Sequence, residues 1–351
     1  MASAAVGVTN LAYRATVSDE DFPGASGAAE KLRFLVNYAV LAPSGHNTQP
    51  WLFRIDGARV NVIADRTRAL PVVDPYDREL TISCGAAIGM LEVAARRFGL
   101  RAEVSISTAT SSDVLAVVSL ADDVPATNEE LRLFAAIRER QTNRNVYRPE
   151  DLPEEVLDKC AAAAVAVGVE MSHVSDETKR AAVAELVAEG DRVQFADPSF
   201  RRELASWVHS SRLGSRDGMS GVAFGMPDVL APATRLVIRT FDLGDGVAAK
   251  DAEKIRSGSP VLSVLAAKTD DCAAWVNTGR GLASVLLHLC VNGLSASYLN
   301  QPIETGDLRS KLQHVFGLAA IPQILLRIGR SDERAPLSAR RPVREVILEP
   351  S

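Results

Sequence analysis

Two stretches of this chain share one pattern, GAAIGMLEVAARRFGL at 85–100 and GRGLASVLLHLCVNGL at 279–294. Each begins with glycine, continues with apolar residues at helical spacing, and ends on Gly-Leu, which is typical of a helix C-terminus. One constant shift of register places Gly85 on Gly279. The pattern predicts a duplicated helix–strand unit whose two long helices share one core. A plain amphipathic helix with a glycine cap would reproduce part of the match.

The segments around these helices alternate in type. Runs of β-forming residues at 51–55 and 60–64, joined by Asp56-Gly57, predict a β-hairpin. Further strands are expected at 102–106, 114–120, 169–174, 261–267 and 324–328. Helical spacing predicts helices at about 28–41, 79–98, 128–140, 153–167, 176–195, 198–210 and 275–291. This mixture predicts an α+β fold with largely antiparallel sheets rather than a βαβ series.

The chain length of 351 residues is about twice that of a usual domain. We expect a leader at 1–27, a first half at 28–122 and a second half at 128–351. The second half contains an insert at about 195–245. Within it, residues 211–231 lack periodicity, which indicates a lid, a binding loop or a disordered stretch.

Composition excludes several classes of protein. Hydrophobic residues make up 47% and charged residues 24%, as in globular proteins. The net charge of −5 gives no general attraction to nucleic acid. We find no apolar run long enough to span a bilayer and no secretion signal, so we expect a cytoplasmic protein without a membrane partner. The four cysteines are far apart and are expected to be buried free thiols.

The loop APSGHNTQPW at 42–51 is the first candidate functional segment. It joins a predicted helix to a strand. Pro43 and Gly45 favour an irregular backbone, while Ser44 and Asn47 supply short polar groups that could contact a polar ligand. The alternative is a tight loop whose side chains satisfy its own backbone.

The segment RQTNR at 140–144 is the second candidate. Arg140 and Arg144 with Thr142 between them could hold a phosphate dianion with two guanidinium groups and a hydroxyl. The alternative is a solvated arginine face at a helix end. The arginines of the C-terminal tail, Arg330 and Arg340 among them, allow the same two interpretations.

Motifs for other chemistries are missing. The chain has no Walker loop, no HExxH and no GxSxG, and its histidines form no local cluster. The GRG at 279–281 lies inside an apolar helical pattern rather than after a strand, so it does not indicate a dinucleotide site. We therefore expect no metal site and no catalytic nucleophile. Anion-binding candidates without a nucleophile indicate an enzyme whose cofactor carries the chemistry.

Taken together, these segments resemble the FMN-dependent nitroreductase family over residues 30–347. The loop at 42–51 matches the family's flavin-contacting loop. The segment at 140–144 resembles its Arg-x-Ser-x-Arg phosphate grip, with Thr142 in place of serine. The resemblance implies a three-layer α+β fold with long central helices and FMN as cofactor.

The resemblance extends to the C-terminal part of the chain. Leu299, Asn300 and Gln301 lie where the family places backbone near the reactive N5 edge and the pyrimidine of the flavin. The segment containing Arg330 and Arg340 resembles the one that returns to the phosphate. The resemblance thus implies these cofactor-binding residues: Pro43, Ser44, Gly45, Asn47, Arg140, Gln141, Thr142, Arg144, Leu299, Asn300, Gln301, Arg330 and Arg340.

The order of the two motifs departs from that of ordinary members, which carry the arginine motif first and the loop soon after. Here the loop is in the first half and the arginine motif in the second. The arrangement is similar to the single-chain, Acg-like branch of the family. It implies two fused pseudo-repeats that keep one complete set of motifs and bind one FMN per chain, so we expect a monomer rather than a homodimer.

The resemblance allows two functions. One is ping-pong hydride transfer through flavin N5 between NADH or NADPH and a small electron-poor acceptor, or oxidation of a biosynthetic substrate. The other is a non-catalytic protein that stores FMN under a lid. Residues 211–231 would separate the two functions, because they form either the lid or a loop that selects the substrate.

Overall fold

The computed structural model describes residues 17–107, 112–210, 214–224 and 226–349. Residues 1–16 of the predicted leader therefore lie outside the described residues. The helices are α2 (Ala28–Ala39), α3 (Arg78–Arg97), α4 (Asn128–Glu139), α5 (Glu154–Val165), α6 (Glu177–Ala196), α7 (Pro198–Ser206), α8 (Ala231–Thr240), α9 (Gly244–Gly258), α10 (Cys272–Val291), α11 (Gln301–Glu304) and α12 (Leu308–Phe316). The strands are β1 (Trp51–Asp56), β2 (Arg59–Ala64), β3 (Leu100–Ile106), β4 (Val114–Asp122), β5 (Glu170–Val174), β6 (Val261–Ala267), β7 (Ser295–Tyr298), β8 (Ile321–Gly329) and β9 (Ile347–Leu348).

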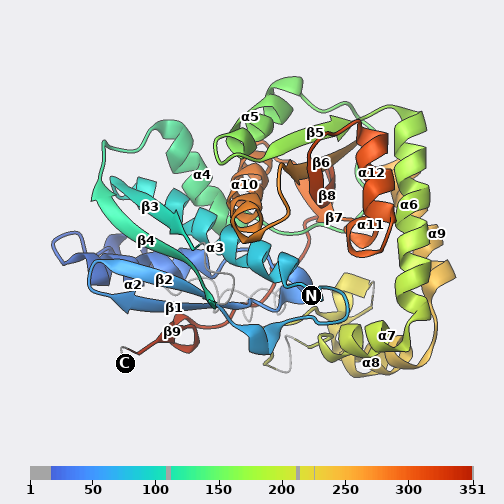
Figure 1. The fold of residues 1–351 in the computed structure, drawn as a ribbon, viewed down its shortest axis with the longest axis horizontal. Coiled ribbons are helices and arrows are strands. Elements are labelled where there is room, and N and C mark those ends of the chain that lie inside the picture. The colour runs from blue at the N-terminus through green and yellow to red at the C-terminus, as the bar shows by residue number, and fades with distance from the viewer. Residues whose placement is uncertain (1–16, 108–111, 211–213, 225, 350–351) are drawn as a thin grey trace, which may run out of the picture.

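The strands form two sheets on either side of the two long helices α3 and α10 (Figure 1). The first sheet has the order β3-β4-β2-β1-β9, and the second has the order β5-β6-β8-β7. All pairings are antiparallel except that of β1 with β9. The predicted α+β fold with largely antiparallel sheets is therefore confirmed.

The crossing of α3 and α10 depends on glycine. A Cβ atom on Gly279 would lie 2.0 Å from the carbonyl oxygen of Ile82 and 2.7 Å from the carbonyl carbon of Gly85. A Cβ on Gly85 would lie 2.1 Å from the carbonyl oxygen of Val276. The backbones of the two helices are therefore in direct contact, which no larger residue would allow at these positions.

The two positions that the sequence pattern aligns, Gly85 and Gly279, thus touch each other across the crossing. A two-fold arrangement produces this result, because each residue near the axis meets its own equivalent. Gly99 and Gly293 both have a φ of 68° directly after their helices, and each leads into a strand, β3 or β7. The structure therefore contains two related helix–glycine–strand units packed on each other.

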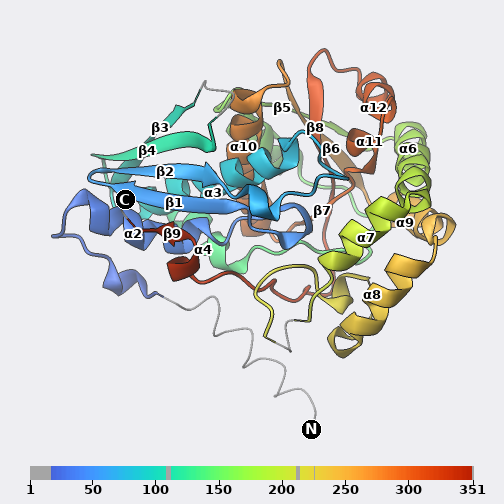
Figure 2. The ribbon, with the colours of Figure 1, turned by 60° about the horizontal axis from the view of Figure 1, so that its bottom comes forward.

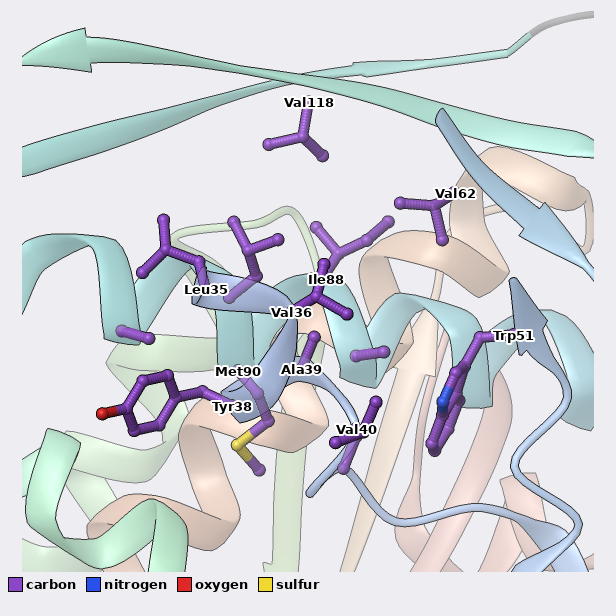
Figure 3. Close-up of a cluster of buried hydrophobic side chains, with 14 of the residues drawn as sticks. Leu35, Val36, Tyr38, Ala39, Val40, Trp51, Val62, Ile88, Met90 and Val118 are labelled. Atoms are coloured by element: carbon purple, nitrogen blue, oxygen red, sulfur yellow. The ribbon is translucent and has the colours of Figure 1, made fainter. Parts of the chain in front are cut away.

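The hydrophobic core of the first half fixes both ends of the loop at 42–50. Figure 3 shows Leu35, Val36 and Ala39 of α2 with Ile88 of α3, and Trp51 at the start of β1 beside them. Trp51 is 0% exposed. Because α2 before the loop and Trp51 after it are both buried, the loop has little freedom to move its backbone away from the core.

Two features cross the predicted boundary between the halves at about residue 125. Strand β9, from the end of the chain, pairs with β1 through Phe53 and Ile347. Helix α4 packs into the core of the first half through Phe134 and Ile137. The division into 28–122 and 128–351 stays a prediction, and these contacts show that the halves are interlocked rather than joined by a free linker.

The insert forms more regular structure than its sequence indicated. Helices α7 and α8 pack together beside α6 and α9, at the side of the molecule away from the first sheet (Figures 1 and 2). The helix predicted to reach residue 210 ends at Ser206, because Val208 forms a β-bridge with Met219 instead. The predicted patternless stretch at 211–231 includes residues 211–213 and 225, which lie outside the described residues.

None of the helices in the described ranges combines the length and the apolar content needed to cross a bilayer. The four cysteines are free thiols, as expected. Cys84 and Cys160 are buried, whereas Cys272 and Cys290 are half-buried.

The glycine crossing leads to a prediction about stability. Gly279→Ala places a methyl group against backbone atoms, so we expect a loss of at least about 2 kcal/mol in the free energy of unfolding. Gly246→Ala in α9 is the matched control, since its Cβ would meet nothing within 4 Å. It should be neutral or stabilising by up to about 1 kcal/mol. Urea unfolding measures both variants, and equal stability of the two would contradict the proposed role of the crossing.

Candidate functional site

One large cavity lies between the first half, the second half and the insert, with a volume of about 2050 Å³. This volume exceeds the roughly 300–1,000 Å³ of a site for one drug-sized ligand. Segments far apart in the sequence line it. They include the loop at 43–47, residues 140–149 except Gln141 and Asn143, parts of α6 to α9, residues 298–304 in part, and the tail at 331–340.

The loop at 42–50 has an irregular backbone. His46, Asn47 and Gln49 have positive φ values of 48°, 55° and 53°, which side chains other than glycine seldom adopt. The Ser44 hydroxyl accepts a hydrogen bond from the Gln49 backbone N–H at 2.9 Å. The loop therefore satisfies part of its own backbone, as the structural alternative predicted. Yet Pro43, Ser44, Gly45 and Asn47 also line the cavity.

Asn47 connects three segments through its side-chain amide. Its Nδ2 donates to the carbonyl oxygen of Gly218 at 3.0 Å, and its Oδ1 accepts from the Arg340 guanidinium at 3.0 Å. The loop is thereby joined both to the insert and to the C-terminal tail. Burial lowers the pKa of the neighbouring His46 to about 4, so this imidazole is neutral near pH 7.

Two buried arginines from distant parts of the chain meet at the carbonyl oxygen of Leu41. Arg140, 4% exposed, donates to it at 3.3 Å, and Arg340, 3% exposed, donates to it at 3.2 Å. Burial lowers the pKa of Arg140, but arginine remains protonated in proteins. Both side chains line the cavity. Together they place positive charge at one wall, where an anion would compensate the cost of burying it.

Arg144 differs from these two because it is exposed to the cavity. Among the residues that the structure describes, it forms neither an ion pair nor a hydrogen bond. Thr142 lines the same cavity and pairs through its backbone with Ala296. The structure therefore brings Arg140, Thr142, Arg144 and Arg340 to one cavity, and their role in binding a cofactor stays a prediction.

The segment at 142–148 is supported by an arginine that the sequence analysis missed. Arg327 lies in the middle of strand β8 and donates to the carbonyl oxygen of Asn145 at 2.9 Å. Its guanidinium carbon is 4.2 Å from the ring centre of Tyr147, a cation–π contact. Tyr147 in turn donates from its hydroxyl to the carbonyl oxygen of Asn143 at 2.6 Å. The signal was available, because an arginine inside the apolar run ILLRIG is unusual.

Asn300 and Gln301 line the cavity, as predicted, and both have polar partners there. Asn300 donates to the Glu79 carboxylate at 2.9 Å, and Gln301 donates to the Asp191 carboxylate at 3.0 Å. These acids belong to no motif in the sequence. Burial raises the pKa of Asp191 to about 7, helped by the negative charge of Asp251. Burial, and then the adjacent Glu79, raise the pKa of Glu304 well above its ordinary value.

Three of the predicted residues do not line the cavity. Arg330 is not among the residues that line the cavity. It forms an ion pair with Glu150 at 3.0 Å near the surface, so its assignment to the site is corrected. Leu299 is buried in the second half's core, and its backbone N–H donates to Leu325. Gln141 is half-buried outside the cavity lining.

The described part of the insert includes a segment, 207–210 with 214–219, that we call the strap. It contacts the loop at 42–50 directly. Gln49 donates to the carbonyl oxygen of Arg216 at 2.9 Å, and Arg68 pairs with Asp217. Asp217 also bonds His209 at 2.9 Å, and this hydrogen bond raises the pKa of His209. Together with the hydrogen bond from Asn47 to Gly218, these contacts join the strap to the first half.

Within the described ranges, no three His, Cys, Asp or Glu side chains gather in a way that could hold a metal ion. What the cavity offers is a cationic wall, an acidic wall and apolar surfaces between them. This arrangement is suited to hold a ligand that is anionic at one end and largely apolar elsewhere.

Comparison with solved structures gives partial likenesses. The FMN-dependent nitroreductase NfnB from Mycobacterium smegmatis, solved in complex with NADPH, is 16% identical. The likeness covers 58% of this chain and 90% of that one, with a TM-score of 0.39. The FMN- and NADPH-dependent NfnB from sphigopyxis sp. strain HMH is 20% identical over 62% of this chain and 99% of that one, with a TM-score of 0.43.

Comparison with curated sequences gives matches over nearly the whole length. No family model matches the chain. Rv3131 of Mycobacterium tuberculosis H37Rv, named as a candidate NAD(P)H nitroreductase, is 31% identical over 92% of both chains. The protein acg of the same strain, named in the same way, is 28% identical over 93% of this chain and 97% of its own. PigM of Serratia sp. strain ATCC 39006 is 24% identical over 91% of this chain and 93% of its own. The chain therefore belongs to the nitroreductase family.

Proposed function

We propose that this protein is an FMN-dependent oxidoreductase that takes reducing equivalents from NADH or NADPH and passes them to a small electron-poor acceptor. The observation that carries the proposal is the meeting of Arg140, Arg144 and Arg340 with the loop at 43–47 at one cavity. Relatives named for NAD(P)H nitroreductase activity support the choice of donor.

The residues present fit FMN. A phosphate dianion needs fixed cations, and Arg140 and Arg340 supply them at one wall with Arg144 nearby. The Thr142 hydroxyl is a further donor in the same segment. The cavity volume is large enough for a drug-sized cofactor with a second molecule beside it. Since both halves of one chain supply the lining, we propose that a monomer is sufficient to bind one FMN.

The ring system of FMN is flat and apolar on its faces, and apolar side chains are among those that line the cavity. Ile82 of α3 and Leu282 of α10 come from the helix crossing, and Ile324 comes from β8. The backbone of Asn300 and Gln301 offers polar groups for the edge of the ring. When bound, FMN would supply the hydride chemistry, so the chain's own residues need only bind, orient and exclude water.

The strap favours a second candidate function, storage of FMN under a cover. Its contacts with the loop at 42–50, from Asn47 to Gly218 and from Gln49 to Arg216, would hold it over this side of the cavity. A cover that opens rarely would exclude nicotinamide and acceptor alike. The two functions therefore differ in whether the reduced nicotinamide reaches the flavin.

The phosphate grip is tested by Arg144→Gln. We expect FMN affinity to fall about tenfold or more, because a hydrogen bond to a charged group is lost. The fold should stay intact, because Arg144 is exposed to the cavity and forms no ion pair within the described ranges. Fluorescence titration of the flavin-free protein with FMN measures the affinity, and circular dichroism checks the fold.

Arg330→Gln is the matched control for this measurement. It removes the same charge from an arginine that lies outside the cavity lining. Its FMN affinity should equal that of the unmodified protein. If both variants bind FMN equally well, the phosphate grip is misplaced.

Access to the flavin is tested by mixing the FMN-loaded protein with NADH or NADPH under anaerobic conditions. Stopped-flow absorbance near the flavin maximum should show bleaching within seconds, followed by recolouring when a quinone is added. Bleaching by dithionite but by neither nicotinamide would contradict the oxidoreductase and support storage.

A further inference from the structure

The wall of the cavity formed by α6 lies against the residues proposed for the edge of the flavin. A Cβ on Gly190 would lie 2.8 Å from the Cβ of Gln301 and 3.0 Å from its carbonyl carbon, so α6 touches the Gln301 backbone. The next residue, Asp191, is thereby held beside the side chain of Gln301. These two side chains line the cavity together.

Asp191 is an incompletely satisfied buried acid. It is 1% exposed, and its Oδ1 accepts a hydrogen bond from the Gln301 amide at 3.0 Å. Among the residues that the structure describes, its Oδ2 has no hydrogen-bond partner, and neither has the Oε1 of Gln301. A buried acceptor without a donor is costly, and native proteins seldom leave one without a reason. Two such acceptors side by side at a cavity wall would be satisfied by a ligand that donates hydrogen bonds.

The surrounding charges favour a cationic donor over a neutral one. Asp251 lies within 3.4 Å of the Gln301 amide nitrogen, and Glu304 and Glu79 line the same part of the cavity. Within the described ranges, Glu79 pairs with Arg78 at 2.8 Å and Asp251 pairs with Lys254 at 3.5 Å, whereas Asp191 forms no ion pair. Burial, and then the negative charge of Asp251, raise the pKa of Asp191, and a cation bound beside it would oppose this rise.

The adjacent walls are apolar and come from the insert. Phe195, Phe200, Leu204, Ile238 and Leu243 belong to one hydrophobic cluster and line the cavity next to α6. The compartment beside the proposed flavin edge thus combines apolar walls with an acidic acceptor. Its chemistry matches an apolar molecule that carries one protonated amine.

We propose that Asp191 and the side chain of Gln301 anchor the electron acceptor of this protein, and that this acceptor is a small aromatic or apolar molecule bearing a protonated amino group. The inference rests on the proposed function, because only the flavin makes this compartment the place of the reaction. The amine would donate to Asp191 Oδ2 and Gln301 Oε1, while the apolar part lies against the insert.

The binding test uses benzylamine, benzyl alcohol and benzoate as probes of equal size and different charge. Isothermal calorimetry with the purified, FMN-loaded protein should show benzylamine binding about tenfold or more tighter than benzyl alcohol, with benzoate weakest. In Asp191→Asn the preference of amine over alcohol should disappear. FMN affinity should not change, because this acid is assigned to the acceptor and not to the cofactor.

Asp332→Asn is the matched control, since Asp332 also lines the cavity but pairs with Arg148 at the surface. It removes one negative charge without touching Asp191, so its preference for benzylamine should match that of the unmodified protein. The ratio of kcat/KM for 4-nitrobenzylamine and 4-nitrobenzyl alcohol gives a second readout. This ratio should fall about tenfold in Asp191→Asn and stay the same in Asp332→Asn.

Three results would overturn the inference. The first is equal binding of amine and alcohol by the unmodified protein, which would mean that water satisfies the acceptors. The second is a loss of the preference for benzylamine over benzyl alcohol in Asp332→Asn that equals the loss in Asp191→Asn. The third is that Asp191→Asn weakens FMN binding but keeps the preference for the amine, which would assign Asp191 to the flavin site. A colourless protein would contradict the proposed function instead, and calorimetry with benzylamine would still test Asp191 in it.

Discussion

The contact between the backbones of α3 and α10 is the constraint on which the rest of the structure depends. Gly85 and Gly279 let the helices approach until a Cβ on either would overlap main-chain atoms of the other. Each helix then leads through a left-handed glycine into a strand of its own sheet. The crossing therefore fixes how the two sheets face each other, and with them the width of the cavity that the halves enclose.

The cavity is asymmetric although its framework is duplicated. The loop at 43–47 comes from the first half, and Arg140, Thr142 and Arg144 come from the second. Arg340 reaches the same place from the tail, whose strand β9 joins the first sheet. Within the described residues, the loop and the arginines of this lining therefore come from different halves of a duplicated framework. The acids of α6 and α11 then give its second wall a different charge.

Most helices and strands, and several of the cavity-lining residues, were predictable from the sequence, because the patterns that indicate them are local. Hydrophobic periodicity predicted most of the helices, and the Asp56-Gly57 turn predicted the hairpin of β1 and β2. Arg140 and Arg144, which the sequence singled out as a candidate pair, both line the cavity. The failures involve contacts over long sequence distances. Arg330 and Arg340 both lie in the arginine-rich tail and cannot be told apart from the sequence. In the fold, Arg330 pairs with Glu150, whereas Arg340 donates to the carbonyl oxygen of Leu41. Helix α8 contains a proline and β-branched residues, so its propensity is weak and packing on α7 decides its form. In the sequence, nothing distinguishes Asp191 from the other acids of its helix. In the fold, the close approach of Gly190 to Gln301 places Asp191 beside the Gln301 side chain.

The central claim is that two related halves of one chain build a single flavin site. The number of FMN molecules bound per chain tests it most directly. It can be measured from the absorbance of flavin released on denaturation, together with the protein concentration from amino-acid analysis, after saturation with FMN and removal of the excess. The account predicts one FMN per chain, in a species whose mass is that of a single chain with one cofactor. Two FMN per chain, one FMN shared by two chains, or none would contradict it.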